Sequence, residues 1–109
     1  MMFQDDTQRA QVCLALLRSL GLQRLWTEEG PTDEALRLYE KDGGHLSSGE
    51  RSIFLLSWSF WTGCGLLNFS DLLRLDQARL EAVGALFSAL AIGPLAIDHW
   101  ISQHGADEP

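Results

Sequence analysis

The stretch from Ser52 to Ser70 constrains the fold most, because it contains no charged residue. Its length reaches the lower limit for a membrane-spanning helix. Serine, threonine, glycine and asparagine residues interrupt it, however, and no Lys/Arg-rich flank orients it in a membrane. A helix that is apolar on all sides must be buried, so we expect a core helix from Ser48 to about Thr62 and no contact with a membrane.

The segment HLSSGERS at the start of this helix has three interpretations. As a calcium-binding loop it would place Glu50 at the twelfth position, but Tyr39, Lys41 and Gly43 at the first, third and fifth positions offer no carboxylate. As a relative of the LSGGQ motif of ABC-type ATPases it would need a GxxxxGK[ST] phosphate loop, which the chain lacks. Ser47 and Glu50 have the spacing of a helix capping box. The segment therefore predicts a helix start.

Caps, glycines and apolar spacing predict the other helices, with Asp6 or Thr7 as the cap of the first and Thr32 as the cap of the second. A chain of 109 residues is long enough for one domain and too short for two. No segment shows the apolar alternation of a β-strand bounded by hairpin signals. The sequence therefore predicts one all-α domain over residues 1–109, with about six or seven short helices and a frayed tail at 105–109. The expected helices cover residues 7–20, 33–42, 48–62, 71–75, 77–91 and 95–104, and residues 21–31 form a short apolar turn or helical fragment.

A helix-turn-helix-like pair is an alternative interpretation of residues 70–91. The second helix of such a pair needs Arg, Lys, Asn or Gln on its outer side to contact bases and phosphates. This segment offers Gln77 and Arg79 beside Glu81 and Ser88. A transcriptional regulator or co-regulator is therefore the alternative function, although we expect no binding to nucleic acid.

The charge balance also argues against binding to nucleic acid. Asp and Glu number 15 against 8 Lys and Arg, which gives a formal charge of −7 and disfavours binding to phosphate backbones or anionic lipid. Cys13 and Cys64 form neither a disulfide framework nor a zinc motif. The first residues lack the basic and apolar segments of a signal peptide. We therefore expect a cytoplasmic protein.

No motif in the chain supports catalysis. His45, His99 and His104 do not have metal-ligand spacing, and Cys64 would follow a helix C-terminus, where the dipole disfavours a thiolate. We expect no catalytic residue, no cofactor and no metal ion, and hence a protein that is not an enzyme. A small hydrolase or ligand-binding domain with a pocket beside Trp58 and Trp61 is a further alternative.

Acidic and aromatic residues predict a contact with another protein. The acids crowd around a Gly-Pro break, where loops present side chains without disturbing a core, and an aromatic side chain can anchor what the charges steer. The alternative is that both tryptophans belong to the core and that the acids only begin a solvated helix. We expect a partner with a basic or apolar surface, and a second copy of the chain is an alternative partner. The predicted contact residues are Trp26, Glu28, Glu29, Asp33, Glu34 and Trp100.

Residues 46–90 resemble a known sequence pattern. LSSGE begins a helix that ends in W-x-G-x-G, and DLLRLD and a Leu-rich segment follow. The pattern is similar to that of a family of small bacterial helical proteins, a resemblance that implies the fold but no activity. In size, acidity and helical make-up the chain is also similar, by type only, to inhibitors made by phages and other mobile elements, such as anti-CRISPR proteins. That likeness implies an inhibitor that covers a surface of a larger protein.

Overall fold

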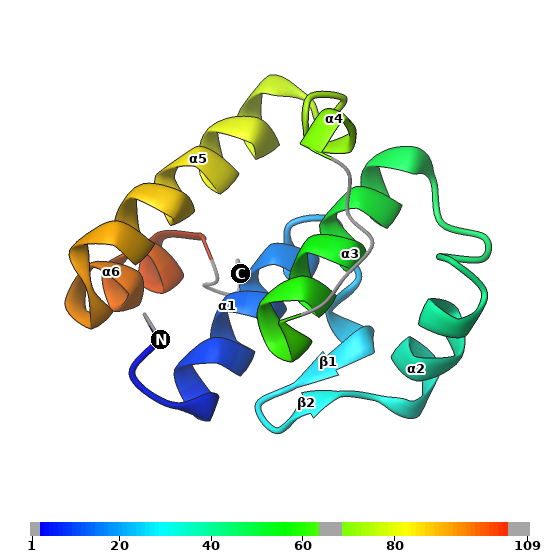
Figure 1. Ribbon diagram of the computed structural model, residues 1–109, viewed down its shortest axis with the longest axis horizontal. Helices are drawn as coiled ribbons and strands as arrows, with labels where there is room; N and C mark the ends of the chain where they lie inside the picture. Colours follow the sequence, from blue (N-terminus) through cyan, green and yellow to red (C-terminus); the bar gives the residue numbers. More distant parts are fainter. Residues whose placement is uncertain (1–2, 64–68, 105–109) are drawn as a thin grey trace.

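The computed structural model describes residues 3–63 and 69–104, and it is mostly helical, at 72%. Six α-helices lie in the described ranges and form a single domain (Figure 1). The predicted all-α class and the number of helices are confirmed. The predicted tail at 105–109 lies outside the described residues. The helices are α1 (Asp6–Arg18), α2 (Asp33–Glu40), α3 (Ser48–Thr62), α4 (Phe69–Leu72), α5 (Gln77–Ile92) and α6 (Pro94–His104).

Helices α1 and α3 form the centre of the core. They pack against each other, and every residue of α3 from Ser52 to Trp58 is buried, as the apolar sequence predicts. The α1 helix is buried on most of its surface, because α3 covers one side of it and α6 covers another. In the described part of the chain no helix has both the length and the apolarity to cross a membrane.

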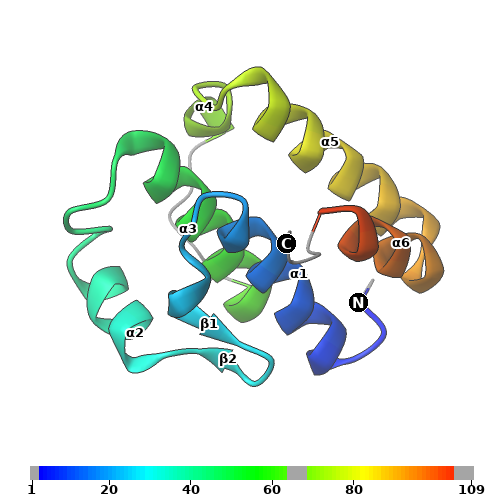
Figure 2. The ribbon, with the colours of Figure 1, turned by 180° about the vertical axis from the view of Figure 1, so that it is seen from behind.

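Helices α5 and α6 form a hairpin beside this centre. The α5 helix packs mainly on α6, and α6 packs on α1, so α5 forms an outer edge of the molecule (Figures 1 and 2). Hydrogen bonds of two side chains also hold this helical hairpin to α1. The buried Gln8 amide donates to Pro94 O at 3.0 Å and to Asp98 Oδ1 at 2.9 Å, and Arg79 Nη2 donates to Ser19 O at 2.6 Å.

A small β-hairpin corrects the prediction for residues 21–31. A 3-10 turn at Gln23–Leu25 agrees with the expected helical fragment, but β1 (Trp26–Thr27) and β2 (Gly30–Pro31) then pair antiparallel. Two-residue strands are too short to show apolar alternation, so they could not be recognised from the sequence. At Gly30, where φ is +125°, a Cβ atom would lie 2.7 Å from Trp61 Cζ2, so only glycine lets the hairpin approach α3 this closely.

The capping residues predicted most of the helix starts. Glu50 N donates to Ser47 Oγ at 3.2 Å, and Ser47 N donates to Glu50 Oε1 at 3.0 Å, which is the predicted capping box. Thr32 caps α2, as expected from the sequence. The first helix differs slightly, because Asp5 caps it instead of the expected Asp6 or Thr7.

Candidate functional site

The predicted acidic contact begins at the turn of the β-hairpin. Thr27 pairs with Gly30, which leaves Glu28 and Glu29 as the two-residue turn, and both side chains are exposed. The turn is held by the Thr27 hydroxyl, which donates to Gly30 O and accepts from Glu29 N, each at 3.1 Å. These two carboxylates are therefore displayed at a defined position.

The other two predicted acids lie in the first turn of α2. Asp33 is exposed, but Glu34 is partly buried and accepts a hydrogen bond from Arg24 Nε at 3.1 Å. Both carboxylates also lie near the positive end of the helix dipole. Glu34 therefore forms a surface ion pair with Arg24, and Glu28, Glu29 and Asp33 are the acids of the predicted contact that are exposed.

Trp26 belongs to the core. Its side chain is 3% exposed and makes edge contacts with Trp58 and Trp61, at ring-centroid distances of 6.1 and 6.2 Å. Its Nε1 has no hydrogen-bond partner among the described residues. The ring has too little exposed surface to act as the predicted anchor beside the acids. Its position agrees with the alternative prediction, in which Trp26 belongs to the core.

Trp100 is also buried, with 3% of its surface exposed. Its Nε1 donates to Ala82 O at 2.9 Å, which fastens α6 to α5. Its ring lines a hollow on the outer side of the two helices. Trp100 is therefore a structural residue beneath a surface feature, and not an exposed anchor.

The outer side of α5 and α6 carries an apolar surface, which we name the α5–α6 face. No charged residue occurs from Ala82 to Ile97, yet only part of this stretch is buried. Ile92 is 78% exposed and Leu95 is 85% exposed at the turn between the helices. Beside them lies the hollow, which has a volume of about 330 Å³. The α5–α6 face comprises Ala85, Ser88, Ile92, Leu95, Ala96, His99 and Gln103, with Ala89 and Trp100 beneath.

The sequence contains a signal for this face that helical periodicity alone does not reveal. Helical spacing predicts one apolar stripe in α5, made of Leu80, Val83, Leu86, Phe87 and Leu90. Val83, Leu86 and Leu90 are buried, but Leu80 is only partly buried and Phe87 is 46% exposed. The same helix also has Ala85, Ser88 and Ile92 on its exposed side, where a soluble protein usually has charges. The uncharged stretch covers more of the helix surface than one buried stripe needs, and this excess indicates an exposed apolar face.

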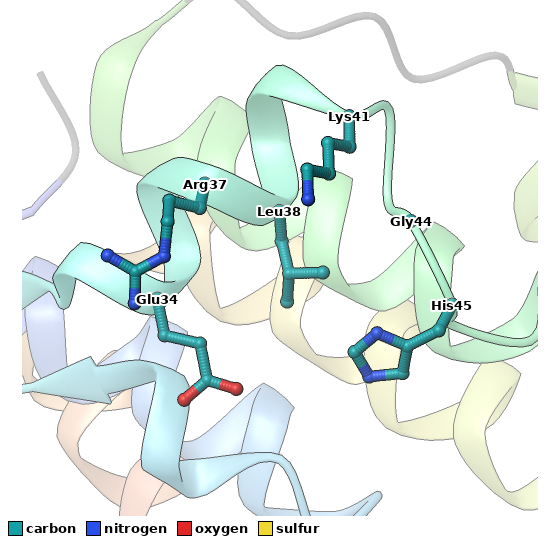
Figure 3. A pocket seen from close by; sticks show the side chains of 6 residues that line it. All are labelled: Glu34, Arg37, Leu38, Lys41, Gly44 and His45. Atoms are coloured by element: carbon teal, nitrogen blue, oxygen red, sulfur yellow. The ribbon is translucent and has the colours of Figure 1, made fainter.

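A second hollow, of about 360 Å³, lies between α2 and the loop that follows it (Figure 3). In this view Leu38 lies between Arg37 on one side and His45 on the other, and the Lys41 ammonium is directed towards Leu38. Arg37 and Lys41 have no carboxylate partner among the described residues. The hollow is lined by Glu34, Arg37, Leu38, Lys41, Gly44 and His45.

Known proteins do not identify the chain. Comparison with protein-family models, with curated proteins and with solved structures gives no match. The resemblance of residues 46–90 to small bacterial helical proteins stays a prediction, and we infer the function from the surface itself.

The helix-turn-helix interpretation lacks cations on its outer side. The α4 helix is only four residues long, and α5 would be the recognition helix. Arg79 is its one cation, and its guanidinium donates to Asp76 Oδ2 at 2.8 Å and to Ser19 O at 2.6 Å. An arginine held in this way is not free to contact a base or phosphate, so the geometry does not favour a DNA-reading helix.

The described thiol and histidines do not form a reactive centre. Cys13 is buried, its Sγ donates to Ser57 O at 3.2 Å, and burial raises the pKa of the thiol, which keeps it neutral and poorly nucleophilic. Cys64 lies outside the described residues. Within the described ranges no three His, Cys, Asp or Glu side chains form a group that could hold a metal ion. Neither hollow is lined by Trp58 or Trp61, where the pocket of a hydrolase or ligand-binding domain was expected.

Proposed function

We propose that this chain is a non-catalytic protein-interaction module that binds its partner through the α5–α6 face. The observation that carries the proposal is the exposure of two large aliphatic side chains, Ile92 and Leu95, on an uncharged surface beside a hollow. Single exposed aliphatic residues are common, but a contiguous apolar surface with a polar rim is typical of a contact site.

The energetics favour a protein partner. Full burial of a leucine or isoleucine side chain contributes about 1.5–3 kcal/mol, and Ile92 and Leu95 are still almost fully available for burial. The hollow beside them can take one apolar side chain of the partner. Its floor is rigid, because the hydrogen bond from Trp100 to Ala82 fixes the ring, and a preformed pocket lowers the entropy lost on binding.

Charges at the edge of the face suggest the chemistry of the partner. The exposed Glu81 lies one helical turn before Ala85 on the same side of α5. The whole chain carries −7. An apolar partner surface that is flanked by Lys or Arg would complement both features. Glu28, Glu29 and Asp33 would add to the long-range attraction.

In this form the module would inhibit a larger protein by covering its surface, as its similarity by type to phage and mobile-element inhibitors implies. The proposal includes a cytoplasmic setting. Cys13 is free and buried, and the other cysteine is too far along the sequence to form a CxxC pair with it, so the chain suits a reducing compartment.

The proposal is tested with a double variant, Ile92→Glu/Leu95→Glu, and a matched control, Leu73→Glu. Leu73 is 61% exposed near the end of α4, so its replacement adds a carboxylate at an exposed leucine outside the α5–α6 face. A partner captured by the wild-type chain is purified, and its affinity for each variant is measured by calorimetry. We expect the double variant to lose about 100-fold or more in affinity, since the two burials together contribute about 3–6 kcal/mol and a 100-fold change represents about 2.8 kcal/mol. The control should bind as the wild type does.

Three outcomes would contradict the proposal. Equal binding of the wild type and the double variant would exclude the face. If the wild type is a stable dimer in sedimentation experiments and the double variant is a monomer, a second copy of the chain occupies the face. Tight binding to duplex DNA at physiological salt, unchanged in the double variant, would favour the helix-turn-helix alternative.

A further inference from the structure

We propose that the hollow between α2 and the following loop binds a small organic monocarboxylate with an apolar body. This site is separate from the α5–α6 face, because it lies on the far side of the β-hairpin from α5 and α6 (Figure 1). The proposal therefore goes beyond the proposed function and can be tested independently of it. Its lining combines cations, one aliphatic side chain and one carboxylate.

The first argument concerns unpaired positive charge in an acidic chain. Among the described residues, Arg9, Arg24, Arg51 and Arg79 each have a carboxylate within 4.0 Å. In the same part of the chain Arg37 and Lys41 have no such partner, although the full sequence has almost twice as many acids as bases. Both side chains line the same hollow, and two unpaired cations close together can attract and bind an anion.

The second argument concerns the spacing of these cations on α2. Arg37 follows Asp33 by four residues, a separation at which an ion pair could form, but their side chains are not paired. Lys41 follows Arg37 by four residues, which places two like charges on one side of the helix and costs about 0.2–0.5 kcal/mol. The Lys41 ammonium is directed towards Leu38 at the centre of the hollow (Figure 3). A carboxylate bound there would relieve the repulsion and accept from both cations.

The third argument concerns the rigidity of the opposite wall. The loop that carries His45 begins at Asp42, whose φ of +53° is uncommon for a residue other than glycine. Arg51 holds this turn, since its Nε donates to Asp42 O at 3.0 Å and its Nη2 donates to Asp42 Oδ1 at 2.6 Å. Gly43 N also donates to Leu38 O at 2.9 Å. The wall is therefore preformed, which favours binding of a small ligand.

Size and composition define the ligand class. A volume of about 360 Å³ is at the small end of the range for ligand pockets. Leu38 supplies an apolar contact, so the ligand should have an aliphatic body as well as a charge. Glu34 lines the same hollow and would repel a second negative charge, which disfavours inorganic phosphate and dicarboxylates relative to a monocarboxylate.

The test is an NMR titration of the whole chain with isovalerate, in parallel with inorganic phosphate and with isoamyl alcohol as the uncharged analogue. We expect saturable shifts of the Gly44 and His45 signals with isovalerate, at a Kd of about 1–10 mM, because exposed ion pairs are individually weak. Phosphate and the alcohol should bind more weakly. The Arg37→Gln/Lys41→Gln variant should lose about 10-fold or more in affinity and still unfold cooperatively, since both side chains are exposed and the removed repulsion offsets the lost attraction to the C-terminal end of α2.

Arg74→Gln is the matched control, because Arg74 is another exposed arginine without a carboxylate partner among the described residues but does not line the hollow. It should bind isovalerate as the wild type does. The proposal is overturned if isovalerate produces no saturable shifts, if the double variant binds as well as the control, or if phosphate binds more tightly than isovalerate.

Discussion

At the scale of single residues, aromatic side chains organise the interior around α3. Tyr39 stacks on Trp58 with ring centroids 4.3 Å apart, and Trp26 meets the same indole edge to face. On the outer side of this group the Arg9 guanidinium carbon lies 4.7 Å from the centroid of the Trp61 ring. These contacts join α1, α2, the β-hairpin and α3 through one group of rings, and aromatic pairs contribute more than their buried area alone.

Phe54 and Phe60 distinguish the centre of this core from its edge. Phe54 is fully buried, whereas Phe60, which the sequence equally places in the core helix, is partly exposed between Phe3 and Phe87. Replacement of Phe54 by alanine should therefore lower the free energy of unfolding by about 3–5 kcal/mol. Phe60→Ala should cause a smaller loss, since its cavity opens towards solvent. Urea denaturation of both variants measures the difference, and equal losses would contradict the assigned core.

The burial of individual amphipathic residues could not be predicted from the sequence. Trp26 and Trp100 are equally amphipathic in the sequence. Trp26 is buried because β1 packs on α1 and its ring contacts Trp58 and Trp61, and Trp100 is buried because α6 packs on α5. Such contacts join residues that are distant in the chain, so local spacing could not reveal them. The same reason explains Gln8, a polar residue that is buried because Pro94 and Asp98 accept its hydrogen bonds.

At the scale of elements, capping residues define where the helices begin. Ser47, Thr32 and Asp76 each accept a hydrogen bond from the backbone three residues later. These bonds are local, so the sequence could predict them without knowledge of the tertiary structure. The β-hairpin could not be predicted in this way, because its strands are short and its position depends on the approach of Gly30 to Trp61.

Removal of the cap of α3 tests this dependence on local bonds. Ser47→Ala should lower the free energy of unfolding by about 1 kcal/mol, since it leaves Glu50 N without its partner at the start of the core helix. Ser48→Ala is the control, because the neighbouring Ser48 side chain is exposed and makes no hydrogen bond with the described residues. Chemical denaturation should separate the two variants, and a loss of equal size in both would show that the capping box has no particular role.

At the scale of the whole molecule, the surface divides into two candidate contact regions. The acids Glu28, Glu29 and Asp33 lie on the β-hairpin and at the start of α2, while the apolar α5–α6 face lies on the opposite edge (Figures 1 and 2). Charge could be located from the sequence, because charged residues are almost always exposed. The apolar face could not, because exposed and buried aliphatic residues have the same appearance in a sequence.

Hydrogen exchange measured with and without the captured partner tests the central claim most directly. If the partner docks on the α5–α6 face, backbone amides within residues 84–99 should exchange more slowly in the complex, while those of residues 27–34 should change little. The Leu73→Glu control should show the same pattern as the wild type, and Ile92→Glu/Leu95→Glu should show none at an equal partner concentration. Protection of residues 27–34 without protection of residues 84–99 would contradict the account and return the contact to the acidic hairpin.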